Sequence, residues 1–276
     1  MSLRIRDDFI HTESTIGSNT AQMVAGGTLT IPSSMPAAER IVKVSAVAQV
    51  RKHWLEEGRV NVEGVLSVSL IYAGVNGGGQ AYYGGMQSVE IAEFTHFVDV
   101  PGATGAMMSS NGVVVLDFQP TLGSDGRTID VDFVLEICSS VYQRQELVFL
   151  TDVGTNQEKK LQITKDTLTL HDVIGYGPVE SDLKDVLPIP IGMEHPVRIL
   201  ELTGAYRLRE SRAMADKAVI QGGIGYKAIC ASISEQTGEE HLVVYRWNDA
   251  TNLELSVEIP GVRPGMTVQA ELEPTE

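Results

Sequence analysis

Apolar and polar residues alternate through long stretches of the chain, which is the pattern of strands with one buried and one solvent-facing side. In residues 128–142 one face carries the apolar side chains of Ile129, Val131, Phe133, Leu135 and Ile137. Residues 60–72 and 252–259 follow the same period, the first with Val62, Leu66, Val68, Leu70 and Tyr72 on one face. Helix-like windows are short. We therefore expect an all-β protein of antiparallel sheets, folded as sandwich or barrel-like modules.

The chain also repeats itself, with four separated motifs recurring at one offset. Residues 16–17, 29–32, 40–41 and 62–64 each have a similar partner 158 positions later, for example Leu29-Thr30-Ile31-Pro32 against Leu187-Pro188-Ile189-Pro190. Pro101-Gly102 recurs at Pro260-Gly261, one position further. A constant offset of this kind indicates two tandem copies of one module. We expect an N-terminal extension over 1–14, module 1 over 15–157 and module 2 over 158–276.

The two copies differ at their ends. In copy one, residues 116–121 lead through the turn 123–126 into the strand 128–142. The matching residues of copy two are 270–275, after which the sequence has one residue. We therefore expect module 2 to lack its last strand and to expose a strand edge, which templates pairing with another chain. The candidate subunit-contact edge consists of Thr267, Val268, Gln269, Ala270, Glu271 and Leu272.

Three interpretations of this edge remain open. A strand from a neighbouring subunit completes the sheet, with residues 1–14 as a docking arm anchored by Ile5 and Phe9. Alternatively, the N-terminal extension or the strand-like runs between 147 and 170 fill the gap within the chain. In the third interpretation the edge stays open, because Glu271, Glu273 and Glu276 discourage pairing.

The order of these motifs resembles the SPOCS domain, which is found in tandem in spore-coat morphogenetic proteins of clostridia and related endospore formers. The resemblance rests on the Ile-Gly turn, the Leu-x-Ile-Pro segment, Val62-Glu63-Gly64, and "FTHFVDVPGA" with its counterpart "VEIPGVRPGM". It implies a non-enzymatic structural protein of the spore envelope. Related coat proteins often carry a LysM module that docks to another morphogenetic protein. No such module follows Glu276 in this sequence, which favours a building block over an adaptor.

Composition excludes several classes of function. The net charge is −15, with 21 Lys and Arg against 36 Asp and Glu, so a nucleic-acid-binding surface is not expected. No run of about 18 apolar residues predicts a membrane helix, and residues 1–14 lack the core of a signal peptide. We expect synthesis in the cytoplasm and a final place in the spore coat or on the spore surface. Cys138 and Cys230 are 92 positions apart, and their spacing does not decide whether they form a disulfide.

No motif of catalysis or metal binding is present in the sequence. The six histidines have no pair at ligand spacing, and the glycines of 74–79 lack the Lys-Ser/Thr of a phosphate loop. Asp130 and Asp132 share one strand face, but the solvated side of an amphipathic strand explains them. Asp125-Gly126 fits a turn, with calcium binding as a weaker alternative. We expect no catalytic residue, no cofactor and no metal.

The leading hypothesis is a self-assembling structural protein of the spore, forming a homo-oligomer or polymer such as a filament, sheet or ring. The second is an adaptor that binds another spore-coat morphogenetic protein. The third is a carbohydrate-binding β-sandwich that uses Trp247, Tyr245 and Tyr82.

Overall fold

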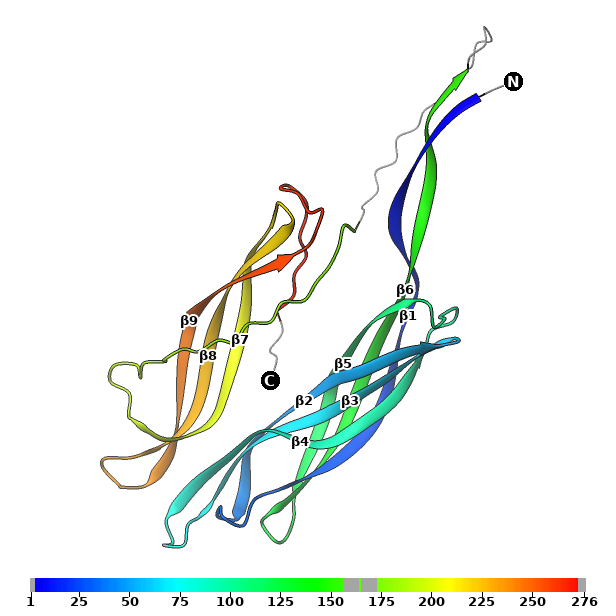
Figure 1. Ribbon diagram of the computed structural model, residues 1–276. Helices are drawn as coiled ribbons and strands as arrows, with labels where there is room; N and C mark the ends of the chain where they lie inside the picture. The colour runs from blue at the N-terminus through cyan, green and yellow to red at the C-terminus, as the bar shows by residue number, and fades with distance from the viewer. Residues whose placement is uncertain (1–2, 156–163, 165–172, 273–276) are drawn as a thin grey trace.

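The protein is all-β, as the alternation predicts. The computed structural model describes residues 3–155, 164 and 173–272, and within them it contains nine strands and no helix (Figure 1). The strands form three antiparallel sheets of three strands each, and none of these sheets closes into a barrel. No helix in the described part of the chain is long and apolar enough to cross a membrane.

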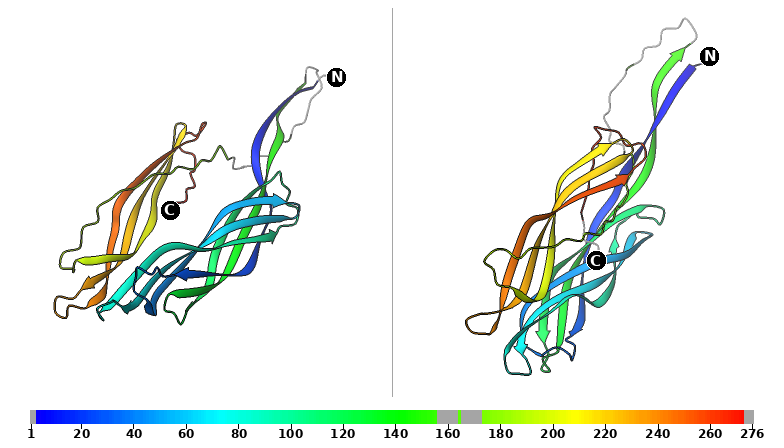
Figure 2. Two further views of the ribbon diagram at one scale, coloured as in Figure 1. Left: turned by 60° about the horizontal axis from the view of Figure 1, so that its bottom comes forward. Right: turned by 60° about the vertical axis from the view of Figure 1, so that its left-hand side comes forward.

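Module 1 is a sandwich of two sheets (Figure 2). The first has the order β1-β6-β5, with β1 at Leu3–Thr30, β6 at Thr128–Thr155 and β5 at Met108–Leu122. The second is a meander of β2 (Ala38–Glu56), β3 (Arg59–Val75) and β4 (Ala81–Asp99). Strand β2 packs over β5 and β1 packs over β4. The predicted hairpin between 116–121 and 128–142 is confirmed by the pairing of β5 with β6.

The core of module 1 is built from the two central strands. The apolar faces predicted for residues 60–72 and 128–142 point at each other between the sheets and are fully buried. Aliphatic and aromatic side chains of this size stabilise the fold by about 1.5–3 kcal/mol each when removed from water. Asp130, Asp132 and Glu136 alternate with these residues on the outer side of the sheet. The sequence pattern therefore places β3 and β6 correctly.

Module 2 repeats one sheet of module 1. Its strands β7 (Pro196–Met214), β8 (Lys217–Ile233) and β9 (Glu240–Glu258) correspond to β2, β3 and β4 at offsets of 158, 158 and 159 residues. The irregularities are repeated as well. Pairing of β2 with β3 shifts at Ala38/Arg40, Ile41/Lys43 and Val50/Lys52, and pairing of β7 with β8 shifts at the same three positions of the repeat. The tandem organisation inferred from the sequence is thus visible strand by strand.

The turn between β5 and β6 is built on Asp125 and Gly126, as predicted. Gly126 has a φ of 64°, a left-handed conformation that glycine adopts without strain. The Asp125 carboxylate accepts hydrogen bonds from the backbone amides of Arg127 and Thr128 at 2.9 Å and from Thr128 Oγ1 at 2.7 Å. These bonds, first among them that from Thr128 Oγ1, lower the pKa of Asp125 to about 2.

The stability of module 1 should depend on the ionisation of this carboxylate. Its folded pKa is depressed below the ordinary value of about 3.9, so its contribution is present above that pH and is lost as the pH falls toward 2. We expect Asp125→Asn to unfold at a lower temperature than the wild type at pH 6, and the difference to shrink between pH 4 and pH 2. Thermal unfolding followed by circular dichroism at each pH measures this. A difference that is constant with pH would contradict the assignment.

Candidate assembly surfaces

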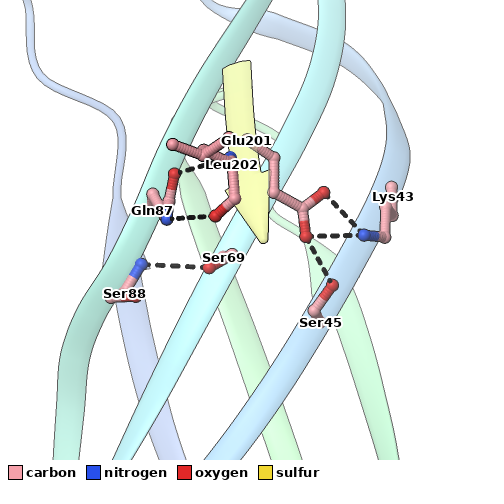
Figure 3. A network of polar contacts seen from close by, with 7 residues as sticks. All are labelled: Lys43, Ser45, Ser69, Gln87, Ser88, Glu201 and Leu202. Carbon is pink, nitrogen blue, oxygen red and sulfur yellow. Dashed lines mark hydrogen bonds and ion pairs between the residues drawn. The ribbon is translucent and has the colours of Figure 1, made fainter. Parts of the chain in front are cut away.

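Module 1 and module 2 meet where the edge strands β4 and β7 come together. The side chain of Gln87 bonds the backbone of Leu202 in both directions: Nε2 donates to the carbonyl oxygen at 2.8 Å, and Oε1 accepts from the amide at 3.0 Å (Figure 3). Beside it, the amide of Ser88 donates to Ser69 Oγ at 3.0 Å and ties β4 to β3. The Gln87 amide therefore satisfies backbone groups on an edge of β7 that has no strand neighbour.

An ion pair crosses the same junction. Lys43 Nζ lies 2.6 Å from both carboxylate oxygens of Glu201, and Ser45 Oγ donates to Glu201 Oε1 at 3.4 Å (Figure 3). Glu201 is only 7% exposed, so loss of Lys43 would leave a buried charge unpaired. The two residues are 158 positions apart and occupy the same place in the two copies. At this position of the repeat, module 1 therefore has a positive charge and module 2 a negative one.

A second ion pair closes the other end of the junction. Arg198 Nη2 donates to both carboxylate oxygens of Glu240 at 2.7 Å, and the amide of Tyr83 donates to Glu240 Oε2 at 3.0 Å. The Arg198 guanidinium lies over the Tyr82 ring, 4.3 Å from its centroid, in the geometry of a cation–π contact. Arg198 belongs to module 2 and Tyr83 to module 1, so the Glu240 carboxylate links the two modules.

Between the ion pairs the contact is apolar and close. Ile71 of module 1 packs with Leu200, Ile229 and Ala231 of module 2 in one buried cluster. A Cβ placed on Gly85 would lie 2.6 Å from the carbonyl oxygen of Leu200. Only glycine allows the backbones to come this close.

The junction cannot be repeated on the far side of module 2. The counterpart of Gly85 in β9 is Val244, and the counterpart of Gln87 is Arg246. Val244 carries the side chain that Gly85 must lack, and it is 43% exposed. A second chain therefore cannot bind to β9 in the way that module 2 binds to β4, and association between chains needs another kind of contact.

The second layer of module 2 contains no strand within the described residues. In module 1 this layer is the sheet β1-β6-β5, whereas β7-β8-β9 is accompanied by the segments 173–195 and 259–272, which are irregular (Figure 1). We call these the flank and the tail. The flank is held by Trp247 Nε1, which donates to the carbonyl oxygen of Pro188 at 2.7 Å, and the tail by Ser211 Oγ, which donates to that of Val268 at 3.0 Å.

Residues 267–272, the candidate subunit-contact edge, have no strand partner among the described residues of this single chain, and their role as a contact edge stays a prediction. The apolar and polar residues alternate there as in a strand, but a strand also needs a neighbour for its backbone groups. In module 1 that neighbour is β6, which lies between β1 and β5. The central strand of this sheet has no counterpart among the described residues of module 2, and the candidate residues Thr267–Leu272 lie in the irregular tail.

Apolar side chains of the flank are left exposed by this arrangement. Ile189 is 36% exposed, whereas its counterpart Ile31 in module 1 is 1% exposed. Leu183, Val186 and Met193 of the flank are also exposed, as is Met266 of the tail. Module 2 therefore presents an apolar surface where module 1 has a packed layer.

A two-stranded ribbon projects from module 1, formed by the first part of β1 and the last part of β6 (Figures 1 and 2). We call residues 3–14 and 143–155 the arm. Their backbones pair in register from Leu3↔Thr155 to Ser14↔Gln143, and Ile5 is paired with Val153. Within the chain, residues 3–14 and 147–155 do not fill module 2, because they pair with each other. The remaining strand-like residues, up to 170, lie outside the described part of the chain apart from residue 164, so a fill from them stays a prediction.

Both faces of the arm carry exposed apolar side chains. Paired residues of antiparallel strands lie on the same side, so Phe9, Val148 and Leu150 share one face and Ile10, Leu147 and Phe149 the other. The large apolar residues other than Ile10 are between 42% and 63% exposed. A two-stranded ribbon has no second layer to cover either face. The arm is therefore an unpartnered surface.

Comparison with known families identifies part of this chain. Residues 37–121, which extend from the start of β2 to the end of β5, match the family described as SipL, SPOCS domain. Residues 37–121 are similar to the SPOCS domain, and we call this region the SPOCS domain below. This confirms the resemblance inferred from the motifs and indicates a spore-related role. Comparisons with curated proteins and with solved structures gave no match.

The SPOCS family is one of non-catalytic structural domains. The structure places the candidate chemical residues on outer faces or in the packed interior. Asp130 accepts a hydrogen bond from Thr28 Oγ1 at 2.7 Å on the outer face of β6, and Asp132 is exposed beside it. No group of three or more His, Cys, Asp or Glu residues in the described part of the chain is placed to hold a metal. Cys138 and Cys230 are free thiols, and burial raises the pKa of the latter.

The three aromatic residues proposed for sugar binding do not form one surface. Tyr82 belongs to the SPOCS domain and lies under Arg198 in the junction. Tyr245 stacks on Trp247 at 5.9 Å but is buried, with its hydroxyl donating to the carbonyl oxygen of Glu194. Trp247 holds the flank through its indole nitrogen. These contacts give each ring a packing role.

Sequence reasoning missed the junction between the SPOCS domain and module 2. Its signal was present in the repeat, since the aligned positions 43 and 201 exchange Lys for Glu and the aligned positions 85 and 244 exchange Gly for Val. Differences of this kind between two copies indicate surfaces at which the two copies make different contacts.

Proposed function

We propose that this chain is a non-enzymatic structural protein of the endospore envelope that self-assembles through β-strand contacts between subunits. The observation that carries the proposal is that one chain presents both an apolar ribbon without a second layer and a module whose second layer, over residues 173–195 and 259–272, has no strand. Long exposed strand edges with apolar side chains pair with other chains unless they are blocked. The similarity of residues 37–121 to the SPOCS domain supports a location in the spore envelope.

The partner in this proposal is the chain itself. The two unpartnered surfaces differ from each other, so their contact is heterologous and continues from subunit to subunit unless it closes into a ring. Other spore-coat proteins are the alternative partners, in which case the chain acts as an adaptor. Neither nucleic acid nor a membrane is part of the proposal, given the net charge of −15.

Purified chain of residues 1–276 tests the proposal by light scattering over a concentration series and by electron microscopy. We expect the mean mass to grow with concentration and extended or ring-shaped assemblies to appear. Deletion of residues 1–14 removes one strand of the arm and should change the assembly. A sharp monomer at high concentration that the deletion leaves unchanged would refute it. A single stoichiometric partner pulled down from sporulating cells, with no self-association, would instead establish the adaptor.

A further inference from the structure

Strand β6 shows what the second layer of a module requires. In its first half, residues 128–142, it lies between β1 and β5, and its inward side chains are buried to 1% exposure or less. Its pairing with β5 begins at Met108↔Tyr142. From Gln143 to Thr155 the same strand continues without β5, so the edge that β5 would occupy is free over the whole arm.

The tail of module 2 is the counterpart of β5. Residues 270–275 align with residues 116–121, which pair with β6 in module 1. The tail has the alternation of a strand but no neighbour, and the β6 edge of the arm has the backbone groups but no neighbour. The tail and the β6 edge of the arm could therefore each supply the strand neighbour that the other lacks among the described residues.

We propose that the arm of one copy docks on module 2 of a second copy, with the β6 edge from Gln143 to Thr155 pairing antiparallel to the tail from Met266 to Leu272. The three strands then follow the order β1, β6, tail, which reproduces the order β1-β6-β5 of module 1. One apolar face of the arm covers the exposed side chains of the flank. This names the donor and the acceptor of the assembly and rests on the proposed function.

The geometry favours a second copy over the chain's own arm. Residues 143–155 continue a strand whose first half is locked into the core of module 1. The junction fixes module 2 against β4, away from the arm, and Figure 1 shows the arm clear of β7, β8 and β9. Bringing the arm to the tail within one chain would require breaking β6 or the junction. Docking between copies requires neither.

Charge on the arm provides the first test. The variant with Val148→Glu and Leu150→Glu places two carboxylates on one apolar face of the arm, where they are exposed in the single chain. We expect association to weaken by about tenfold or more for each carboxylate that the contact would bury. The matched control carries Val24→Glu and Val114→Glu, two valines on the outer face of the sheet β1-β6-β5 that are 73% and 54% exposed, against 63% for each of the two arm residues. Circular dichroism verifies that both variants fold.

Disulfide trapping provides the second test. Chains with Phe149→Cys are mixed with chains with Gln269→Cys and oxidised, with Leu147→Cys and Thr151→Cys as neighbouring registers. Cross-strand pairs have Cα atoms within the range of a disulfide. We expect a heterodimer crosslink from at least one arm position and none from Val114→Cys. The wild type, which retains Cys138 and Cys230, gives the background.

The outcomes separate this inference from the proposed function. Loss of assembly in the arm variant together with a crosslink to Gln269→Cys supports it. Assembly of the arm variant at wild-type strength overturns it and leaves self-assembly standing through other surfaces. A chain that carries both Phe149→Cys and Gln269→Cys and crosslinks only within itself, while the mixed single variants do not crosslink, overturns the docking between copies. A wild-type chain that stays monomeric overturns the proposed function and this inference together.

Discussion

Gly64→Ala should destabilise module 1 by about 3 kcal/mol, the upper end of what overpacking in a dense core commonly costs. A Cβ at this position would lie 2.2 Å from the carbonyl oxygen of Gln49 and 2.4 Å from Cζ of Phe94. Phe94 is paired directly with Gly64 across β3 and β4, and its ring occupies the space above the glycine. The backbone oxygen belongs to a paired strand, so it cannot move away cheaply.

Thermal and urea unfolding of the Gly64 variant measure this cost. A loss of 3 kcal/mol corresponds to a fall of roughly 10 °C in the unfolding midpoint. Gly112→Ala is the matched control, because it lies in β5 and a Cβ there meets no atom within 4 Å. Its free energy of unfolding should change by about 0.5 kcal/mol or less. Gly222→Ala, the counterpart in module 2, should cost less than Gly64→Ala, since its nearest contact is 2.8 Å. Equal stability of the Gly64 and Gly112 variants would contradict this account.

Gly85→Val should separate the two modules without unfolding either of them. The added Cβ would lie 2.6 Å from the Leu200 carbonyl oxygen and 2.8 Å from its Cα, so the strands must part. A cost of about 2 kcal/mol would shift the docked equilibrium by roughly 30-fold. Valine suits a strand intrinsically, and Val244 occupies the same position of the repeat in β9.

Small-angle scattering measures the separation as an increase in the radius of gyration, and calorimetry as two unfolding transitions in place of one. Gly112→Val serves as the control, with the same substitution at an open position of β5. Both chains should show the same far-ultraviolet circular dichroism. A Gly85→Val chain as compact as the control would mean that the modules do not depend on this approach.

Local sequence patterns predicted those parts of the fold in which a strand and its neighbour lie close in sequence. Residues 60–72 and 128–142 have their buried faces where the alternation placed them, and Asp125-Gly126 forms the expected turn. Residues 267–272 are irregular in the single chain, because an alternating pattern describes which side would be buried and not whether a partner strand exists.

The arm and the junction could not be predicted from local sequence patterns, because each depends on contacts between segments far apart in the chain. Pairing of residues 3–14 with residues 143–155 joins segments more than 120 positions apart, and nothing in either segment specifies the other. The junction depends on how two folded modules meet, which requires Gly85, Lys43 and Glu201 in three dimensions. In the sequence, the junction is indicated by the aligned positions at which the two copies differ, such as 43 against 201 and 85 against 244.

The ion pair between Lys43 and Glu201 also decides which modules can sit side by side. The partners are the same position of the repeat, so two first modules meeting in this way would set lysine against lysine, and two second modules glutamate against glutamate. A buried like-charge encounter of this kind disfavours the wrong pairing by several kcal/mol. The duplication therefore did more than lengthen the chain. The charge difference between the copies lets module 1 pair with module 2 and disfavours the pairing of two identical modules.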